Sequence, residues 1–111
     1  MTVLDAYRRE LTLPDAKACV GAGWGPLVER LYNACDHQGV AILQIKEKFG
    51  GLRFYVGGAS DSTLQLIEAA EDESRKTCEL CGKAGGQRVE RGWVWTRCDE
   101  CWEKQIGQGQ S

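Results

Sequence analysis

Four cysteines near the C-terminus have the residue type and spacing that bind a metal ion. Cys78 and Cys81 form one Cys-x-x-Cys pair and Cys98 and Cys101 form a second, with sixteen residues between the pairs. This is the spacing of a four-thiolate zinc site, in which a tight turn brings both sulfurs of a pair to one side. Because four thiolates leave no coordination position for water, we predict one structural Zn²⁺ and no metal catalysis.

The residues around the two pairs predict how this module closes. Gly82 can take the left-handed backbone angle that turns amide groups towards the first two sulfurs. Gln87 to Glu90 and Trp93 to Arg97 are strand candidates on either side of Arg91 and Gly92. Such a hairpin returns the second cysteine pair to the side of the first.

A short helix is expected after the hairpin. Asp99 and Glu100 fall in its first turn and Lys104 near its end, the order that the helix dipole favours. Knuckle, hairpin and helix in this order resemble a treble-clef zinc finger, whereas a zinc ribbon needs a further strand after Cys101. Two independent redox pairs are the alternative, but these suit a thioredoxin-like βαβ pattern that the sequence does not display.

The rest of the chain predicts an α+β fold in which helices pack on an antiparallel β-hairpin. We expect residues 1–76 to form this region, residues 77–106 the zinc module packed on it as one compact unit, and residues 107–111 a disordered tail. Periodicity and breakers indicate helices over Thr2 to Glu10, Pro14 to Val20, and Pro26 to Gly39. The last of these places four residues on its apolar face: Leu27, Leu31, Ala34 and Cys35.

Alternating residues predict the hairpin itself. Val40 to Lys46 and Leu52 to Val56 read as strands joined by the turn KFGG, with one face covered by helices. The other face carries Lys46, Arg53 and Tyr55. A helix capped by Asp61 or Ser62 then runs to about Lys76, with an apolar side and a solvated run EDES; its inward residues are Leu64, Ile67 and Ala70.

Charge and composition limit the classes of partner. The chain has 14 basic and 16 acidic residues, and four thiolates with one zinc ion change the net charge from −2 to about −4. Neither residues 1–76, with nine basic and eleven acidic side chains, nor residues 77–111, with five of each, is strongly basic. This balance disfavours a general binder of nucleic acid. No apolar run approaches membrane length, so we expect no membrane partner.

The remaining cysteines bear on the compartment. The charged start MTVLDAYRRE does not read as a signal peptide, so we expect a reducing, cytoplasmic setting. Cys19 and Cys35 are then free thiols inside the fold. A Cys19–Cys35 bridge, or a second metal held by Cys35 and His37, are the alternatives.

Catalytic patterns are weak, so we expect no enzyme activity and no small-molecule substrate. His37 is the one histidine, and it lies near the end of a helix, where it is most often a surface residue. The glycine pairs lack the lysine and hydroxyl residue of a phosphate-binding loop. Carboxylates are present without a nucleophile or an open metal beside them; these are Glu47, Glu68, Glu71, Asp72 and Glu73.

Tryptophan and arginine residues in the module predict a surface that binds a macromolecule. Trp93 and Trp95 are two apart on a strand and should face the same way, with Trp102 near the second cysteine pair. They either form the small core of the module or anchor a protein partner. Candidate partner contacts are Trp93, Trp95, Arg88, Arg91, Arg97, Arg53 and Tyr55. The same residues could stack bases and hold phosphates, which leaves nucleic acid as the second hypothesis.

Several longer motifs resemble a group of small, mostly uncharacterised zinc-finger proteins encoded by phages and prophages. They are GWGPL, IKEKFGGLRFYVGG, AAEDESRKTCELCG and the tryptophan-rich stretch before CDECW, which together span Gly23 to Trp102. The resemblance implies a fold and a setting in the host cytoplasm. Small acidic phage proteins commonly bind host machinery, so it also implies an inhibitor of a host defence protein, such as an anti-CRISPR or anti-restriction factor, with a transcription regulator as the alternative.

Overall fold

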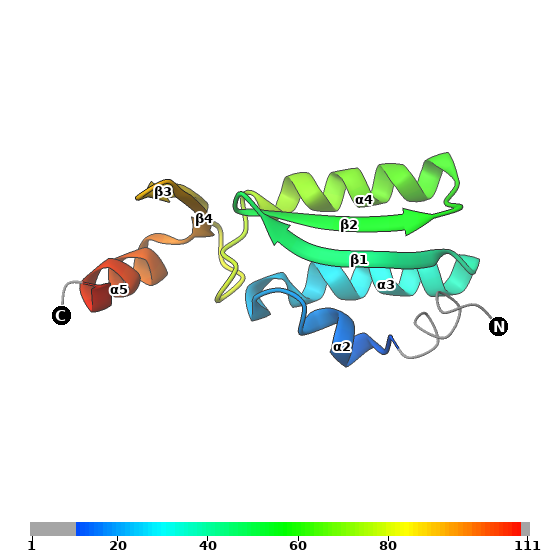
Figure 1. Cartoon of the computed structure of the whole chain (residues 1–111), viewed down its shortest axis with the longest axis horizontal. Helices are drawn as coiled ribbons and strands as arrows, with labels where there is room; N and C mark the ends of the chain where they lie inside the picture. The colour runs from blue at the N-terminus through cyan, green and yellow to red at the C-terminus, as the bar shows by residue number, and fades with distance from the viewer. Residues whose placement is uncertain (1–10, 110–111) are drawn as a thin grey trace.

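The computed structural model describes residues 11–109 and confirms the α+β fold class, with a helix and hairpin region joined to a C-terminal four-cysteine module (Figure 1). The described residues extend over 51 × 26 × 22 Å. In chain order the elements are α2 (Leu13–Lys17), the 3₁₀ turn η1 (Ala22–Trp24), α3 (Gly25–Gln38), β1 (Ala41–Lys48), β2 (Gly51–Gly57), α4 (Asp61–Ser74), β3 (Gly86–Glu90), β4 (Trp93–Arg97) and α5 (Asp99–Gly109). The helix expected over Thr2 to Glu10 lies outside the described residues.

Most helix ends follow the local signals in the sequence. The Thr12 hydroxyl accepts a hydrogen bond from the Asp15 amide and caps α2, which ends at Lys17 rather than at Val20. Gly39, with φ of 68°, ends α3 as predicted. Between α2 and α3 the stretch GAGWG forms a 3₁₀ turn that leads directly into α3. At the other end, α5 continues through Gly109, into the segment expected to be a disordered tail.

The first hairpin has a tight turn and one irregularity. Lys48 pairs with Gly51, and the two residues between them, Phe49 and Gly50, have φ of 52° and 76°, as a two-residue hairpin turn requires. A β-bulge lies between Ile42 and Gln44. The extra residue lets Ile42 and Ile45, three positions apart, both face the core.

Helix α4 covers the outer edge of β2. Ser60, and not Asp61 or Ser62, caps the helix, and Ile67 and Ala70 are buried as predicted. Leu64 was expected to point inward but is 47% exposed, while Thr63 beside it is buried. The run EDES is also not wholly solvated: Ser74 Oγ and Glu71 Oε2 accept hydrogen bonds, each 2.9 Å long, from the Leu52 and Phe54 amides. These bonds satisfy donors at a sheet edge that would otherwise be free.

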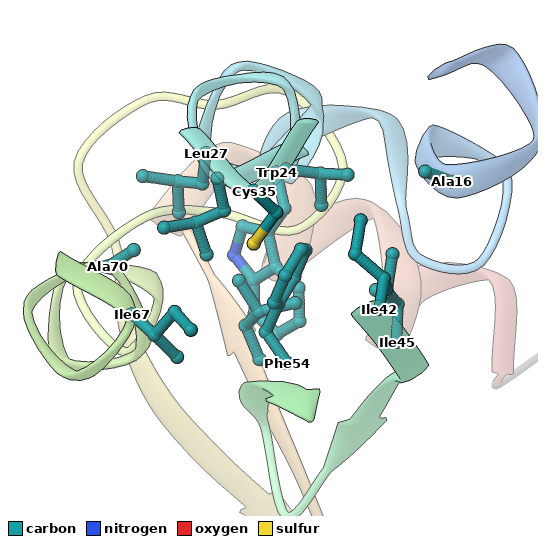
Figure 2. Packing of buried hydrophobic residues seen from close by; sticks show 12 residues of the cluster. Ala16, Trp24, Leu27, Cys35, Ile42, Ile45, Phe54, Ile67 and Ala70 are labelled. Atoms are coloured by element: carbon teal, nitrogen blue, oxygen red, sulfur yellow. The ribbon is translucent and has the colours of Figure 1, made fainter. Parts of the chain in front are cut away.

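The hydrophobic core lies between the first hairpin and the helices α3 and α4 (Figure 2). Trp24 is fully buried at its centre, with Leu52 and Val28 also among its largest enclosed side chains. Cys35 is buried here, as predicted. Cys19 is exposed, which corrects the expectation of a thiol inside the fold, because α2 ends before it and leaves it in the following turn.

The core region and the four-cysteine module meet through the glycine-rich loop. Trp24 Nε1 donates to the Thr77 carbonyl at 2.8 Å, and the Gly23 amide donates to the Glu79 carbonyl at 2.7 Å. A Cβ atom on Gly23 would lie 2.0 Å from the Cys78 carbonyl oxygen. Glycine is therefore needed at this position because backbone packs directly on backbone.

The same junction has a second contact at the tip of the first hairpin. Thr96 Oγ1 donates to the Gly50 carbonyl at 2.5 Å, and Gln87 Nε2 donates to the Phe49 carbonyl at 3.3 Å. The turn of the first hairpin thus rests on the second hairpin (Figure 1). These two contacts hold the module against the core region.

Gly23→Ala should destabilise the metal-loaded protein by about 2 kcal/mol or more, since the added methyl group would force apart two packed backbone segments. Gly25→Ala is the matched control, because Gly25 has a helical backbone conformation and an added Cβ atom would lie no closer than 3.6 Å, from Lys17 Cε, to its surroundings. Alanine there should leave the free energy of unfolding unchanged or raise it. Urea denaturation of the two variants measures both effects. Equal stability would contradict the described junction.

The two cysteines outside the module should differ in reactivity. Burial raises the pKa of the Cys35 thiol, so little of the reactive thiolate forms there, whereas Cys19 is exposed. Native metal-loaded protein should therefore be alkylated rapidly at Cys19 and at Cys35 only after denaturation, as mass spectrometry of the labelled peptides can show. Rapid labelling that persists in Cys19→Ser and maps to Cys35 would be inconsistent with this core.

Candidate metal centre

The structure brings the four module cysteines together in the arrangement that a single metal ion needs. The sulfur atoms of Cys78, Cys81, Cys98 and Cys101 all lie within 4.8 Å of one another, and those of Cys81 and Cys98 are 3.6 Å apart. Metal–sulfur bonds of about 2.3 Å in a tetrahedron place sulfurs roughly 3.8 Å apart. The spacing fits that tetrahedron and is far from the roughly 2.05 Å of a disulfide.

The first cysteine pair lies in a tight backbone turn. The Cys78 amide donates to the Lys83 carbonyl at 2.8 Å, and the Gly82 amide donates to the Cys78 carbonyl at 3.0 Å. Gly82 has the positive φ, 82°, that its position after the pair predicts. Burial raises the pKa of Cys78, but hydrogen bonds from backbone amides outweigh it and lower the pKa to about 6. The turn therefore favours a thiolate, the form that binds metal.

The second pair joins β4 to α5. Cys98 follows the last residue of β4, and Cys101 lies in the first turn of α5, where its amide faces the Cys98 sulfur at 3.4 Å. Hydrogen bonding to the Cys98 sulfur and then burial raise the pKa of Cys101 to about 12. Four sulfurs this close cannot all carry charge without a cation, so metal binding must release protons.

A buried ion pair fixes the first pair against β4. Glu79 lies between the cysteines of the first pair, and its backbone amide donates to the Thr96 carbonyl at 3.0 Å. Its side-chain carboxylate accepts from the Thr96 amide at 2.8 Å and from the Arg97 guanidinium at 2.5 Å. Burial raises the pKa of the Glu79 carboxyl, while its two donors act in the opposite direction. Arg97 was predicted to contact a partner; the structure corrects this, because its side chain is only 11% exposed and is used inside the module.

Sequence reasoning missed Glu79. A glutamate between two metal-binding cysteines reads as a solvated residue, and only the return of β4 beside it reveals its partners. The Thr96 amide and the Arg97 guanidinium come from a later part of the chain, and their hydrogen bonds offset the free-energy cost of burying this carboxylate.

The tryptophans separate into a packed pair and an exposed side chain. The rings of Trp95 and Trp102 lie 5.8 Å apart between centroids at 47°, which joins β4 to α5. Trp93 is 69% exposed. Trp95 and Trp102 therefore pack inside the module, whereas Trp93 is a surface residue, although Trp93 and Trp95 are two positions apart on the same strand.

The predicted partner arginines are also not equivalent. Arg88 pairs with Asp99 in the first turn of α5 and is only 28% exposed. Arg91, at the turn of the second hairpin, is exposed and forms no ion pair with another described residue. Arg53 and Tyr55 lie on the outer face of the first hairpin, as expected, and Tyr55 is 42% exposed.

The other candidate chemistry is not assembled. Within residues 11–109, no group of three or more metal-ligand side chains includes Cys35 or His37. His37 is exposed at the end of α3, while Cys35 points into the core (Figure 2). The described residues thus contain one four-thiol centre and no second candidate metal group of that size.

The fold and centre define an α+β protein with a C-terminal module whose four cysteines are placed so that they could hold a metal ion. Comparisons with protein-family models, with curated proteins and with solved structures found no match to this chain. None of the described helices has the length and apolar character needed to cross a membrane.

One metal ion per chain should be lost when a module cysteine is replaced. Cys81→Ser and Cys101→Ser should each bind metal far more weakly, because serine does not supply a thiolate. Cys19→Ser, at an exposed position outside the cluster, is the control and should keep one ion per chain. Elemental analysis by mass spectrometry of the purified proteins makes the comparison; full metal content in both cluster variants would rule out the four-cysteine centre.

Proposed function

We propose that this protein is a zinc-stabilised, non-enzymatic binding module whose partner is another protein. Four thiolates in a tetrahedral set favour Zn²⁺, or an iron centre as the other metal of that geometry. Because all four ligand positions come from the chain, the ion would hold the module together and take no part in a reaction. Metal analysis of the purified protein distinguishes zinc from iron.

The observation that supports a protein partner is a groove between the tips of the two hairpins. Phe49 and Trp93, 67% and 69% exposed, both line it, and its volume is about 310 Å³. Large aromatic side chains on a groove are the residues that contribute most to protein interfaces. Phe49 also occupies a left-handed turn position, where a bulky residue is unfavourable and where asparagine or glycine would be easier to accommodate.

Nucleic acid is the second candidate. The outer face of the first hairpin combines exposed aromatic and basic side chains, such as Tyr55 and Lys48, a combination that single-strand binders use. The acidic net charge disfavours the many phosphate contacts of a nucleic-acid complex, and the carboxylate of Glu47 opposes a phosphate placed in the groove itself. A protein partner accommodates this mixed chemistry better.

The sequence resemblance to phage-encoded zinc-finger proteins suggests where the partner would be found. On that basis we propose a host protein, with components of restriction, CRISPR or other defence systems as the first candidates. Action by binding alone, without catalysis, agrees with a closed four-thiolate centre.

Trp93→Ala and Phe49→Asn should each abolish capture of the partner from nuclease-treated host lysate, since truncation of an aromatic anchor typically costs about 2 kcal/mol or more, roughly a 30-fold loss of affinity. Asparagine suits the turn, so Phe49→Asn should keep the fold. Leu66→Ala, a 50% exposed residue on α4, is the matched control and should retain capture. Capture that disappears on nuclease treatment of the wild-type sample would favour the nucleic-acid hypothesis instead.

A further inference from the structure

The outer face of the first hairpin carries a row of basic residues that form no ion pair with the acidic residues of the described part of the chain. Lys46 and Lys48 alternate along β1 and point to the same face as Arg53 on β2. None of the three forms an ion pair with another described residue. Elsewhere in the described chain most basic side chains are paired: Lys17, Arg30, Arg75, Lys83, Arg88, Arg97 and Lys104.

Two of these charges oppose each other directly. Lys46 and Arg53 are partners in the register of the hairpin, and like charges in that position destabilise a sheet. An opposite pair would fit the same backbone at lower free energy. The repulsion is relieved when an anionic group lies over this face.

The basic row leads to the aromatic groove. Lys46 and Lys48 are followed by Phe49, and the groove beyond it is lined by Phe49, Gly92, Trp93 and Val94, with Glu47 and Lys48 at its margin. The Lys46 ammonium lies 5.8 Å from the centre of the Tyr55 ring, and that of Lys48 lies 5.7 Å from the centre of the Phe49 ring. Cations and exposed rings therefore follow one another along this face up to the groove.

We propose that this surface binds an extended acidic segment of a protein partner, with an apolar side chain of that segment in the groove. This inference rests on the proposed function and names the chemistry of the partner. Carboxylates two residues apart in an extended segment repeat at about 6.6 to 6.8 Å, the same repeat as Lys46 and Lys48 along β1. Three basic residues suit a short acidic segment, whereas the phosphate contacts of a tight nucleic-acid complex are typically about 6 to 10.

The probe is a synthetic peptide with three glutamates at alternate positions and a leucine two residues after the last. It is titrated into the metal-loaded, ¹⁵N-labelled protein while amide chemical shifts are recorded at low salt. We expect saturable shifts confined to the hairpin face and the groove. A peptide with glutamine in place of glutamate should bind at least tenfold more weakly, and one with serine in place of leucine should lose the shifts at Trp93.

Charge reversal on the protein supplies the decisive comparison. Lys46→Glu should weaken binding of the acidic peptide at least tenfold and at the same time raise the melting temperature, because it converts the Lys46–Arg53 repulsion into an attraction. Lys76→Glu is the control, because it makes the same change in net charge at an exposed site outside the hairpin. A change in net charge alone should leave the peptide affinity within about twofold of the wild-type value.

Three results with the purified protein, and a fourth in the capture assay, would overturn the inference. One is the absence of saturable shifts with the acidic peptide, another is equal weakening by Lys46→Glu and Lys76→Glu. The third is tighter binding of a twelve-nucleotide oligothymidylate than of the peptide, which would assign the face to single-stranded nucleic acid. If Trp93→Ala abolishes capture of a host protein while Lys46→Glu leaves it intact, the proposed function stands and the acidic segment fails.

Discussion

The fold depends on the packing of a glycine-rich loop against the first cysteine pair of the candidate metal centre. Trp24 is fully buried in the core, yet its indole donates to the Thr77 carbonyl, one residue before Cys78. Gly23 brings the backbone close enough for its amide to reach the Glu79 carbonyl. A single short segment therefore contacts both the hydrophobic core and the candidate metal centre, so a substitution that disrupts the packing of one region should also destabilise the other.

This coupling explains how a chain of 111 residues supports two small structural regions. A core of this size supplies limited stability, and structural zinc in small fingers contributes about 10 to 16 kcal/mol at neutral pH. If the centre holds zinc, that free energy is available to the core because Trp24, the loop and the tip of the first hairpin all rest on the module. The Glu79–Arg97 pair adds a buried link within the module itself.

Local signals in the sequence predicted the parts of this arrangement that local physics decides. Cysteine spacing identified the centre, alternation identified both hairpins, and Gly39 identified the end of α3. The errors arose where distant contacts decide. Leu64 is exposed because the face of α4 that packs on β2 runs through Thr63 rather than Leu64, and Arg97 is buried because it pairs with Glu79 from an earlier part of the chain. The β-bulge after Ile42 likewise has no signature in the alternation that it interrupts.

The remaining local conflicts gather on one side of the molecule. Phe49 occupies a turn position that disfavours a bulky side chain, Lys46 faces Arg53 across the hairpin, and Trp93 remains exposed. None of these features stabilises the isolated chain, and simple substitutions would remove each of them. Sequences that are otherwise consistent with their fold tend to keep such conflicts at functional sites. Their concentration around the groove, away from the buried faces of α3 and α4, is the physical argument for the binding site that we propose there.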